Sequence, residues 1–327
     1  MELFASEQEI ISWGIFCSGV NASAPHNLGE ETEGDIMILL KELGSNALLA
    51  LPGLAIVLGY TVLLWWTINR ITKFNDEKEL FDKKNYAFLL QRTAIVAAQI
   101  IAMLAVLPDY DVEAPLASSA WLALEGLWVF VAILAARFIV DWAILPKTNN
   151  TELIRDGNMA MATVEASFYI GVGFLLKGSL TGTASSNWLS LASTVVFYIA
   201  GVLFVIGVFY LHELITKYDM RGRLREGNMT TALDAASILL GVSVVTSVGV
   251  AGDFTGWWIG FRAFFVTALI SVIMLYVLRW VVDLVIIKGH TVRTIQDTNN
   301  VPAAALLAAS LVMLALLISN VMTYVIW

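Results

Sequence analysis

Long apolar stretches separated by short polar segments dominate the hydrophobic pattern of the chain. Crossing a bilayer as a helix takes about 20 predominantly apolar residues. Stretches near that length fall at 46–69, 86–107, 118–145, 157–180, 186–211, 228–250, 257–287 and 300–326. The pattern therefore predicts an all-α polytopic membrane protein with eight transmembrane helices. Composition agrees, because only 14% of the 327 residues are charged, against about 25% in soluble domains.

The polar segments between the predicted helices alternate in charge. Segments 70–84, 146–156, 216–227 and 288–299 hold 13 of the 19 Lys and Arg residues. The opposite loops carry Asp109, Asp111, Glu113 and Asp253 and almost no basic residue. Because Lys and Arg are enriched in cytoplasmic loops, we expect the basic loops in the cytoplasm and both termini outside it.

Residues 1–45 precede the first predicted helix, and we assign them to an extracytoplasmic N-terminal segment. Their apolar piece, IISWGIFCSGVNASA, follows acidic residues and no Lys or Arg. This argues against a signal peptide, whose first part is positive, although ASA resembles a cleavage site. Cys17 is the single cysteine, which excludes an internal disulfide and any multi-cysteine metal site.

Asparagines recur at the start of every second predicted helix. Asn85, Asn158, Asn228 and Asn300 each stand where a basic loop enters an apolar stretch, at intervals of 73, 70 and 72 residues. An asparagine side chain can accept a hydrogen bond from an unpaired N–H of the first helical turn. In lipid, an N–H group without an acceptor is energetically costly. The sequence therefore predicts capped helices and a helical hairpin as the repeating unit.

A longer period overlies the hairpin repeat. Arg137 and Asp141 on the third predicted helix recur as Arg279 and Asp283 on the seventh, 142 residues later. We therefore predict two four-helix halves, 46–180 and 186–327, fused in tandem. An even number of helices in each half keeps the halves parallel, related by an axis along the membrane normal. The chain is then a covalent pseudo-dimer; further oligomerisation is open.

The charged turn, Gly-Asn and following apolar helix resemble a known family. They occur as Arg155-Asp156-Gly157-Asn158 and Arg225-Glu226-Gly227-Asn228. This pattern is similar to that of the YjfL family of bacterial inner-membrane proteins, a group of unknown function whose usual members resemble one half of this chain. The resemblance implies a bacterial inner membrane and no known activity. The second helix departs from it, with Lys84-Asn85 in place of Gly-Asn.

Ionisable side chains lie inside the predicted spans at similar depth. At about 1.5 Å of rise per residue, seven of them fall within roughly 6–12 Å of the basic-loop ends of their helices. They are Arg92, Arg137, Asp141, Glu165, Asp234, Arg279 and Asp283. Because charges facing lipid are costly, these groups must face one another or water.

Pairing divides the seven groups. Arg137 with Asp141, and Arg279 with Asp283, are one helical turn apart and can form supporting ion pairs within their own helices. Arg92 and Glu165 both stand seven residues after their asparagines, so we expect them to meet if the hairpins pack alike.

Asp234 has no partner evident in the sequence. A lone buried carboxylate either stays neutral or binds a proton or cation, and we predict Asp234, Glu165 and Arg92 as an ion- or proton-handling site. The alternative is that Asp234 joins an ion-pair cluster with Arg279 or Arg92. Towards the other membrane face, we expect Glu125 to pair with Lys177 or Arg262.

Two functions remain open at this point. One is a transporter or channel for protons or small cations that uses the intramembrane carboxylates. The other is a non-catalytic membrane scaffold or envelope-stress component that recruits a peripheral cytoplasmic protein through its basic loops, above all 70–84. The chain shows no enzyme signature, no histidine pair placed for haem and no nucleic-acid module. We therefore expect no catalysis, no metal and no cofactor, and the lipid bilayer as its surroundings.

Overall fold

The computed structural model describes residues 30–72, 75–111, 113–146, 148–216, 219–286, 295 and 297–326. The chain divides into two units, 1–49 and 50–327. The first contributes the start of helix α1, which spans Glu30–Thr72; residues 30–45 of the predicted N-terminal segment are thus helical. Everything described below belongs to the second unit, and residues 1–29, including Cys17, lie outside the described part.

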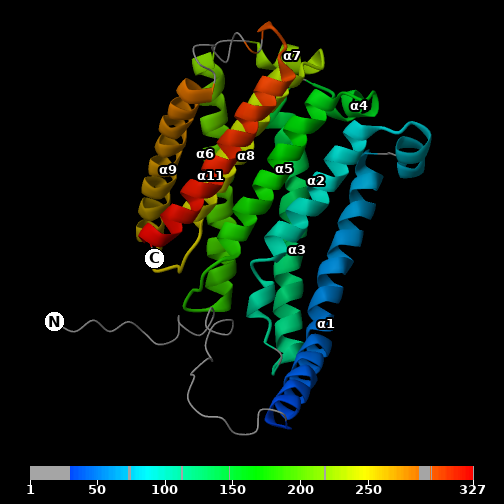
Figure 1. Ribbon diagram of the computed structural model, residues 1–327, viewed down its shortest axis with the longest axis vertical. Coiled ribbons are helices and arrows are strands. Elements are labelled where there is room, and N and C mark those ends of the chain that lie inside the picture. The colour runs from blue at the N-terminus through cyan, green and yellow to red at the C-terminus, as the bar shows by residue number, and fades with distance from the viewer. Residues whose placement is uncertain are drawn as a thin grey trace, which may run out of the picture. The chain divides into compact units, whose positions relative to one another are not determined.

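Eight described helices are long and apolar enough to cross a membrane (Figure 1). They are α1 from Leu51 onward, α2 Tyr86–Met103, α3 Pro115–Ile139, α5 Met159–Leu180, α6 Asn187–Thr216, α8 Met229–Val250, α9 Trp257–Ile286 and α11 Val301–Ile326. Each predicted apolar stretch corresponds to one of them, which confirms the all-α polytopic class.

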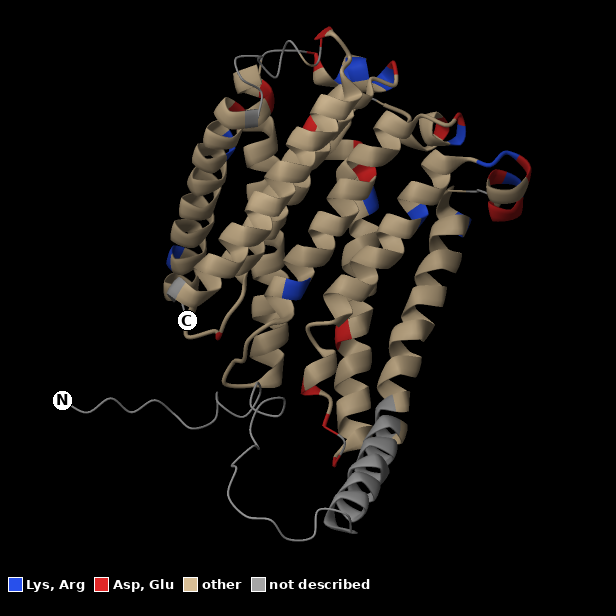
Figure 2. Ribbon diagram, viewed as in Figure 1, with Lys and Arg blue, Asp and Glu red and all other residues tan. Residues whose placement is uncertain are grey.

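Short elements connect the long helices. A π-helical turn η2 (Lys78–Asp82) and the helices α4 (Asn150–Arg155) and α7 (Met220–Arg225) precede α2, α5 and α8. We call the face that carries them the basic face. The loop residues 104–111, 113–114, 181–186 and 251–256 form the opposite, acidic face, where the 3₁₀ turn η3 (Leu107–Asp109) lies. Most charged residues lie at or near these two ends of the helices (Figure 2).

The asparagine-capped helices α2, α5, α8 and α11 pack side by side in chain order, and we call them the central row (Figure 1). Buried positions make up 78% of the most apolar window of α5 and 83% of that of α8, against 50% for α2 and 28% for α11. The two inner helices come from different halves, so the α5–α8 contact joins the halves.

Small residues let the helices of the central row approach closely, as in other membrane bundles. A Cβ atom built at Gly173 of α5 would lie 2.8 Å from the backbone of Ala98 of α2. One built at Gly178 would lie 2.3 Å from the carbonyl oxygen of Ser247 on α8. Backbone contact on both sides of α5 therefore fixes the spacing of the row.

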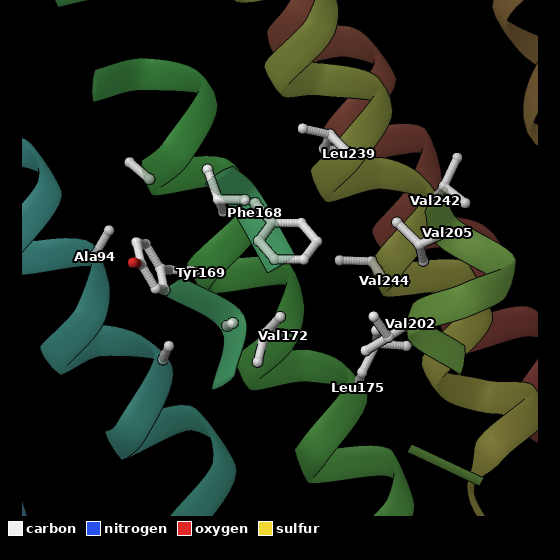
Figure 3. Packing of buried hydrophobic residues seen from close by; sticks show 14 of the residues in the cluster. Ala94, Phe168, Tyr169, Val172, Leu175, Val202, Val205, Leu239, Val242 and Val244 are labelled. Atoms are coloured by element: carbon white, nitrogen blue, oxygen red, sulfur yellow. The ribbon is translucent and has the colours of Figure 1, made fainter. Parts of the chain in front are cut away.

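Apolar side chains of α5, α6 and α8 fill the middle of the molecule. Figure 3 shows Phe168, Val172, Leu175, Val202, Val205, Leu239, Val242 and Val244 in this core, with Tyr169 turned towards Ala94 of α2.

Asparagines join the first two repeats to the ones that follow them at the basic face. Oδ1 of Asn85 accepts from the N–H of Phe88, and its Nδ2 donates to the carbonyl oxygens of Ile154 and Arg155 at 2.9 and 3.1 Å. Asn158 repeats both roles towards the end of α7, at 3.0 and 3.1 Å. The asparagine thus caps its own helix and satisfies the unpaired carbonyls of the following short helix.

The remaining two asparagines also cap their helices. Asn228 accepts from the N–H of Thr231 at 2.9 Å, and Asn300 accepts from that of Ala303 at 3.2 Å. We call each place where an asparagine follows a short connecting element a joint. The recurrence of the same side-chain bond explains the spacing of the asparagines in the sequence.

The halves are also linked at the acidic face. The N–H groups of Gly252 and Phe254 donate to the carbonyl oxygens of Thr181 and Thr183 at 3.0 and 2.8 Å. Oδ1 of Asp253 accepts from the N–H and the hydroxyl of Thr183 at 2.7 and 2.8 Å. Because these bonds favour the ionised carboxylate, they hold the pKa of Asp253 below its usual range.

Candidate functional site

The first-half cluster consists of Gln91 on α2, Arg137 on α3, Glu165 on α5 and Asp141 in the π-helical turn η4 (Val140–Ile144) that ends α3. Nη1 of Arg137 lies 2.8 Å from Oδ1 of Asp141 and 3.7 Å from Oε1 of Glu165. Nε2 of Gln91 donates to Oε2 of Glu165. Glu165 has no exposed surface, so its carboxyl group is enclosed by protein.

The second-half cluster consists of Asp234 on α8, His212 on α6, and Tyr276, Arg279 and Asp283 on α9. Nη2 of Arg279 donates to Oδ1 of Asp234 at 2.8 Å, and its Nε lies 3.8 Å from Oδ2 of Asp283. Nε2 of His212 lies 3.2 Å from Oδ2 of Asp234. The Tyr276 hydroxyl lies 3.3 Å from Nδ1 of His212. Five titratable side chains are thus connected in series, in the order Tyr276, His212, Asp234, Arg279 and Asp283.

The arginines of the two clusters occupy matching positions. Arg137 and Arg279 each precede an acid on the same helix by one turn, and each also reaches a carboxylate on an inner helix of the central row. Asp141 lies closer to its arginine than Asp283 does, and it also accepts from the side chain of Asn150 at 2.8 Å. Both within-helix pairs thus occur, with the second one looser.

The inner carboxylates do not occupy matching positions. Counted from the asparagine cap, Gln91 and Asp234 are each the sixth residue of their helices, and Glu165 and Leu307 are each the seventh. The first half therefore has glutamine and glutamate where the second has aspartate and leucine. In each half one carboxylate faces the arginine. In the first half it lies on the second asparagine-capped helix, α5, and in the second half it lies on the first one, α8.

A pocket adjoins the second-half cluster. It is lined by Thr230, Asp234, Ser237, Arg279, Ile295, Ala304, Leu307 and Ala308. Thr230, Asp234 and Ser237 share one face of α8, since they are separated by about one turn. The pocket is small, about 10 Å³, and half of its lining residues are apolar. Asp234, 7% exposed, borders it, whereas Glu165 has no exposed surface.

The expectation that Asp234 has no partner is wrong. Arg279 and His212 both contact its carboxylate, and the alternative of a cluster with Arg279 describes the structure. His212 was missed because its place near the end of α6 suggested an interfacial side chain. Only the packing of α6 against α8 brings it, 4% exposed, to the carboxylate.

The expected contact between Arg92 and Glu165 is also absent from the described residues. Glu165 forms its ion pair with Arg137, which approaches from α3. Arg92 is buried, and its Nη2 donates to the hydroxyl of Thr72 on α1 at 2.8 Å. Equal distance from the caps gave Arg92 and Glu165 similar depth, but their side chains point to different neighbours.

Glu125 does not form the expected ion pair with Lys177 or Arg262 in the described part of the chain. It lines a cavity of about 410 Å³ at the acidic face, together with Asp109, Tyr110, Ser190 and Thr194. No lysine or arginine is among the residues that line this cavity. Proximity along the membrane normal was therefore a poor guide to pairing for this residue.

Polar groups without a hydrogen-bond partner continue from the first-half cluster towards the acidic face. Among the described residues, they include the Tyr169 hydroxyl and both amide atoms of Gln99, and neither side chain has any exposed surface. Tyr169 lies one helical turn beyond Glu165 on α5. The described residues contain no group of three or more histidine, cysteine or acidic side chains placed to hold a metal ion.

The helices and buried clusters define an integral membrane protein of repeated helical hairpins with ion pairs inside the transmembrane region. The chain belongs to the DUF350 family, a domain of unknown function, whose model matches residues 39–180 and 186–322. This double match confirms a family of unknown function present as two fused halves. The first match begins at residue 39, inside the segment 1–45 that we assign to the N-terminal segment ahead of the first half.

One curated relative extends over most of the chain. A UPF0719 transmembrane protein of Aquifex aeolicus (strain VF5) is 23% identical over 276 residues, which cover 81% of this chain and 99% of that protein. No solved structure matches the chain. The comparisons thus establish family and membrane character.

Proposed function

We propose that the chain moves protons or a small cation through the membrane, with the second-half cluster as the exchange site. The observation that carries this proposal is the series Tyr276–His212–Asp234–Arg279, whose carboxylate borders a small pocket with a mixed polar and apolar lining. Histidine changes charge near neutral pH. Ionisable groups inside membranes are otherwise rare and mark proton or ion pathways.

In this proposal Asp234 takes up the proton or cation and Arg279 is the internal cation that competes with it. His212 contacts one carboxylate oxygen and Arg279 the other, so a proton or cation that reaches Asp234 displaces one of them. Release follows when the displaced group returns to the carboxylate. Glu165 and Arg92 have a supporting role, because Glu165 is enclosed and paired with Arg137.

We further propose that the basic face lies in the cytoplasm of a bacterial inner membrane, with both termini outside. The support is the concentration of Lys and Arg in the loops of that face, which sets orientation in multi-pass proteins. The relative from Aquifex aeolicus agrees with a bacterial membrane. Cysteine labelling of single-cysteine variants at exposed Lys78 and Asp111 tests the orientation: only position 111 reacts with an impermeant reagent from outside.

Ion flux in proteoliposomes tests the transport proposal. Purified protein is reconstituted with a pH-sensitive dye inside, and a proton, Na⁺ or K⁺ gradient is imposed. We expect Asp234→Asn and His212→Gln to lower the flux by about tenfold or more. Asp297→Asn serves as the control, because Asp297 pairs with Arg223 at an exposed position of the basic face. Wild-type flux equal to that of empty vesicles, or equal flux in Asp234→Asn, would end the proposal.

One observation favours a scaffold as the second candidate. Each inner carboxylate is held by an arginine, and buried ion pairs of this kind can serve to specify packing. A scaffold predicts no flux above the vesicle background. It also predicts that replacing segment 75–84 abolishes capture of a peripheral protein, whereas His212→Gln leaves capture intact.

A further inference from the structure

The first joint differs from the others in the residues that precede its asparagine. Lys83 and Lys84 stand there, whereas the second and third joints have an acid followed by glycine, and the fourth has threonine followed by asparagine. The first joint is therefore the one with two cations next to a helix cap. This difference does not follow from the hairpin fold, which all four joints share.

The backbone makes the choice of lysine at position 84 more notable. Lys84 has φ of 52°, and Gly157 and Gly227 at the equivalent positions have φ of 85° and 78°. This left-handed conformation suits glycine and is strained for residues with a Cβ atom. Asn299 at the fourth joint has φ of 49°, but asparagine adopts this conformation readily, so lysine is the costliest of the four residues at this position.

A pocket lies next to this lysine at the basic face. It has a volume of about 290 Å³ and is lined by Lys83, Lys84, Asn85, Tyr86, Ala87, Arg155, Asp156, Gly157 and Met159. We call it the first-joint pocket. It lies between the first residues of α2 and α5, where two transmembrane spans begin. Its depth is therefore that of the lipid headgroups.

The charges around the first-joint pocket favour an anion. Glu79 is 4% exposed and lies 2.8 Å from Nζ of Lys83. Burial raises the pKa of Glu79, but hydrogen bonds from Lys83 and Asn85 outweigh this effect and hold the pKa below its usual range. Glu79 thus stays ionised beside Lys83 and Arg155. Lys83, Lys84 and Arg155 outnumber the two acids at the pocket, Glu79 and Asp156.

We propose that the first-joint pocket binds a phosphate group, with Lys84 and Arg155 as its cations. Lysine supplies a compact charge, and arginine offers paired donors that match phosphate oxygens. The N–H groups of Tyr86 and Ala87 at the start of α2 add the positive end of a helix dipole. Tyr86 and Met159, 69% and 37% exposed, give apolar surface beside it, which suits the headgroup of an anionic phospholipid.

Thermal unfolding of the purified full-length chain in neutral detergent tests the proposal. The probes are short-chain phosphatidylglycerol, short-chain phosphatidylcholine, sn-glycerol 3-phosphate and inorganic phosphate. We expect phosphatidylglycerol to raise the unfolding temperature of the wild type and Lys84→Gly to weaken that binding by about tenfold. Lys84→Gly is expected to be at least as stable as the wild type without probe, because glycine relieves the left-handed strain.

A matched variant separates the pocket from the overall charge of the face. Lys78→Ala removes a positive charge from the same segment outside the pocket lining, and it is expected to bind as the wild type does. Stabilisation by phosphatidylglycerol alone identifies a lipid headgroup, and equal stabilisation by the soluble phosphates identifies a free phosphate. The proposal is overturned if no probe stabilises the wild type, or if Lys84→Gly and Lys78→Ala weaken binding equally.

Discussion

Moving the carboxylate of the second-half cluster from one helix to the other tests how the two halves correspond. Replacing Asp234 by glutamine reproduces the residue of the first half at that position, Gln91, and leaves Arg279 facing an amide. Replacing Leu307 by glutamate reproduces Glu165. Leu307 is 9% exposed and lines the same pocket as Arg279 and Asp234, so a carboxylate there can reach the guanidinium.

The expected magnitudes follow from the burial of Arg279. Its side chain is 13% exposed and that of Asp234 is 7% exposed, and breaking such a pair costs about 3–5 kcal/mol. Asp283 remains 3.8 Å from Arg279 and offsets part of the loss, so we expect about 3 kcal/mol for Asp234→Gln. At roughly 2 °C per kcal/mol in a chain of this size, the unfolding temperature falls by about 6 °C.

The assay is a double-mutant cycle of thermal unfolding in detergent micelles, followed by tryptophan fluorescence. Leu307→Glu alone is expected to destabilise, because it places a second carboxylate beside Asp234. The double variant should recover at least half of the loss seen in Asp234→Gln, which gives a strongly favourable coupling. If the double variant is no more stable than the sum of the two single losses predicts, the correspondence between the halves is refuted.

Three further predictions concern the joints, the central row and the acidic face. Asn158→Asp keeps the cap acceptor but turns an oxygen towards two carbonyl oxygens of α7, so it should lower the free energy of unfolding by about 2 kcal/mol, measured by chemical denaturation. Gly173→Val should cost about 1–3 kcal/mol because a Cβ there meets α2 backbone at 2.8 Å, whereas Gly207→Ala, with nothing within 4 Å, should be nearly neutral. Because the pKa of Asp253 is lowered, its contribution to the stability of this loop contact is complete above the unfolded pKa of about 3.9 and is lost as the pH falls through the folded pKa. Hydrogen exchange at the Thr183 amide, corrected for its intrinsic rate, should therefore become faster below about pH 4. Exchange that is equally fast at pH 6 would contradict the hydrogen bond to Asp253.

Hydrophobic pattern and cap spacing predicted the helices well because both are local properties. A run of apolar residues forms a span whatever its neighbours are, and an asparagine caps the turn that follows it. The second role of Asn85 and Asn158, as donors to the next short helix, is not local. It depends on the lateral distance between repeats, which no short stretch of the sequence specifies.

Ion-pair partners were harder to predict because they depend on how each helix is rotated about its axis. Distance from a cap gives the depth of Glu165 and Arg92 but not the direction in which they point. Arg137 approaches Glu165 from α3, and His212 approaches Asp234 from α6. Counting along the chain therefore located the layer of charges and misassigned the contacts inside it.

The position of the carboxylates follows from the order of helices in the central row. In each half, one asparagine-capped helix lies inside the row and the other at its edge: α5 and α8 are inner, α2 and α11 are outer. Glu165 lies on α5 and Asp234 on α8, so the acid is on the inner helix both times. A carboxylate on the inner helix is flanked by protein on both sides, whereas one on α11 has lipid nearby, where a charge is costly.

The difference between the halves is thus a consequence of their fusion. In the first half the inner helix is the second capped helix of the half, and in the second half it is the first. Two identical halves would place one of their carboxylates on an edge helix. In the double variant of Asp234 and Leu307, the new glutamate lies on the edge helix α11. It should for this reason restore stability only in part. Complete restoration would show that lipid contact does not decide which helix carries the acid.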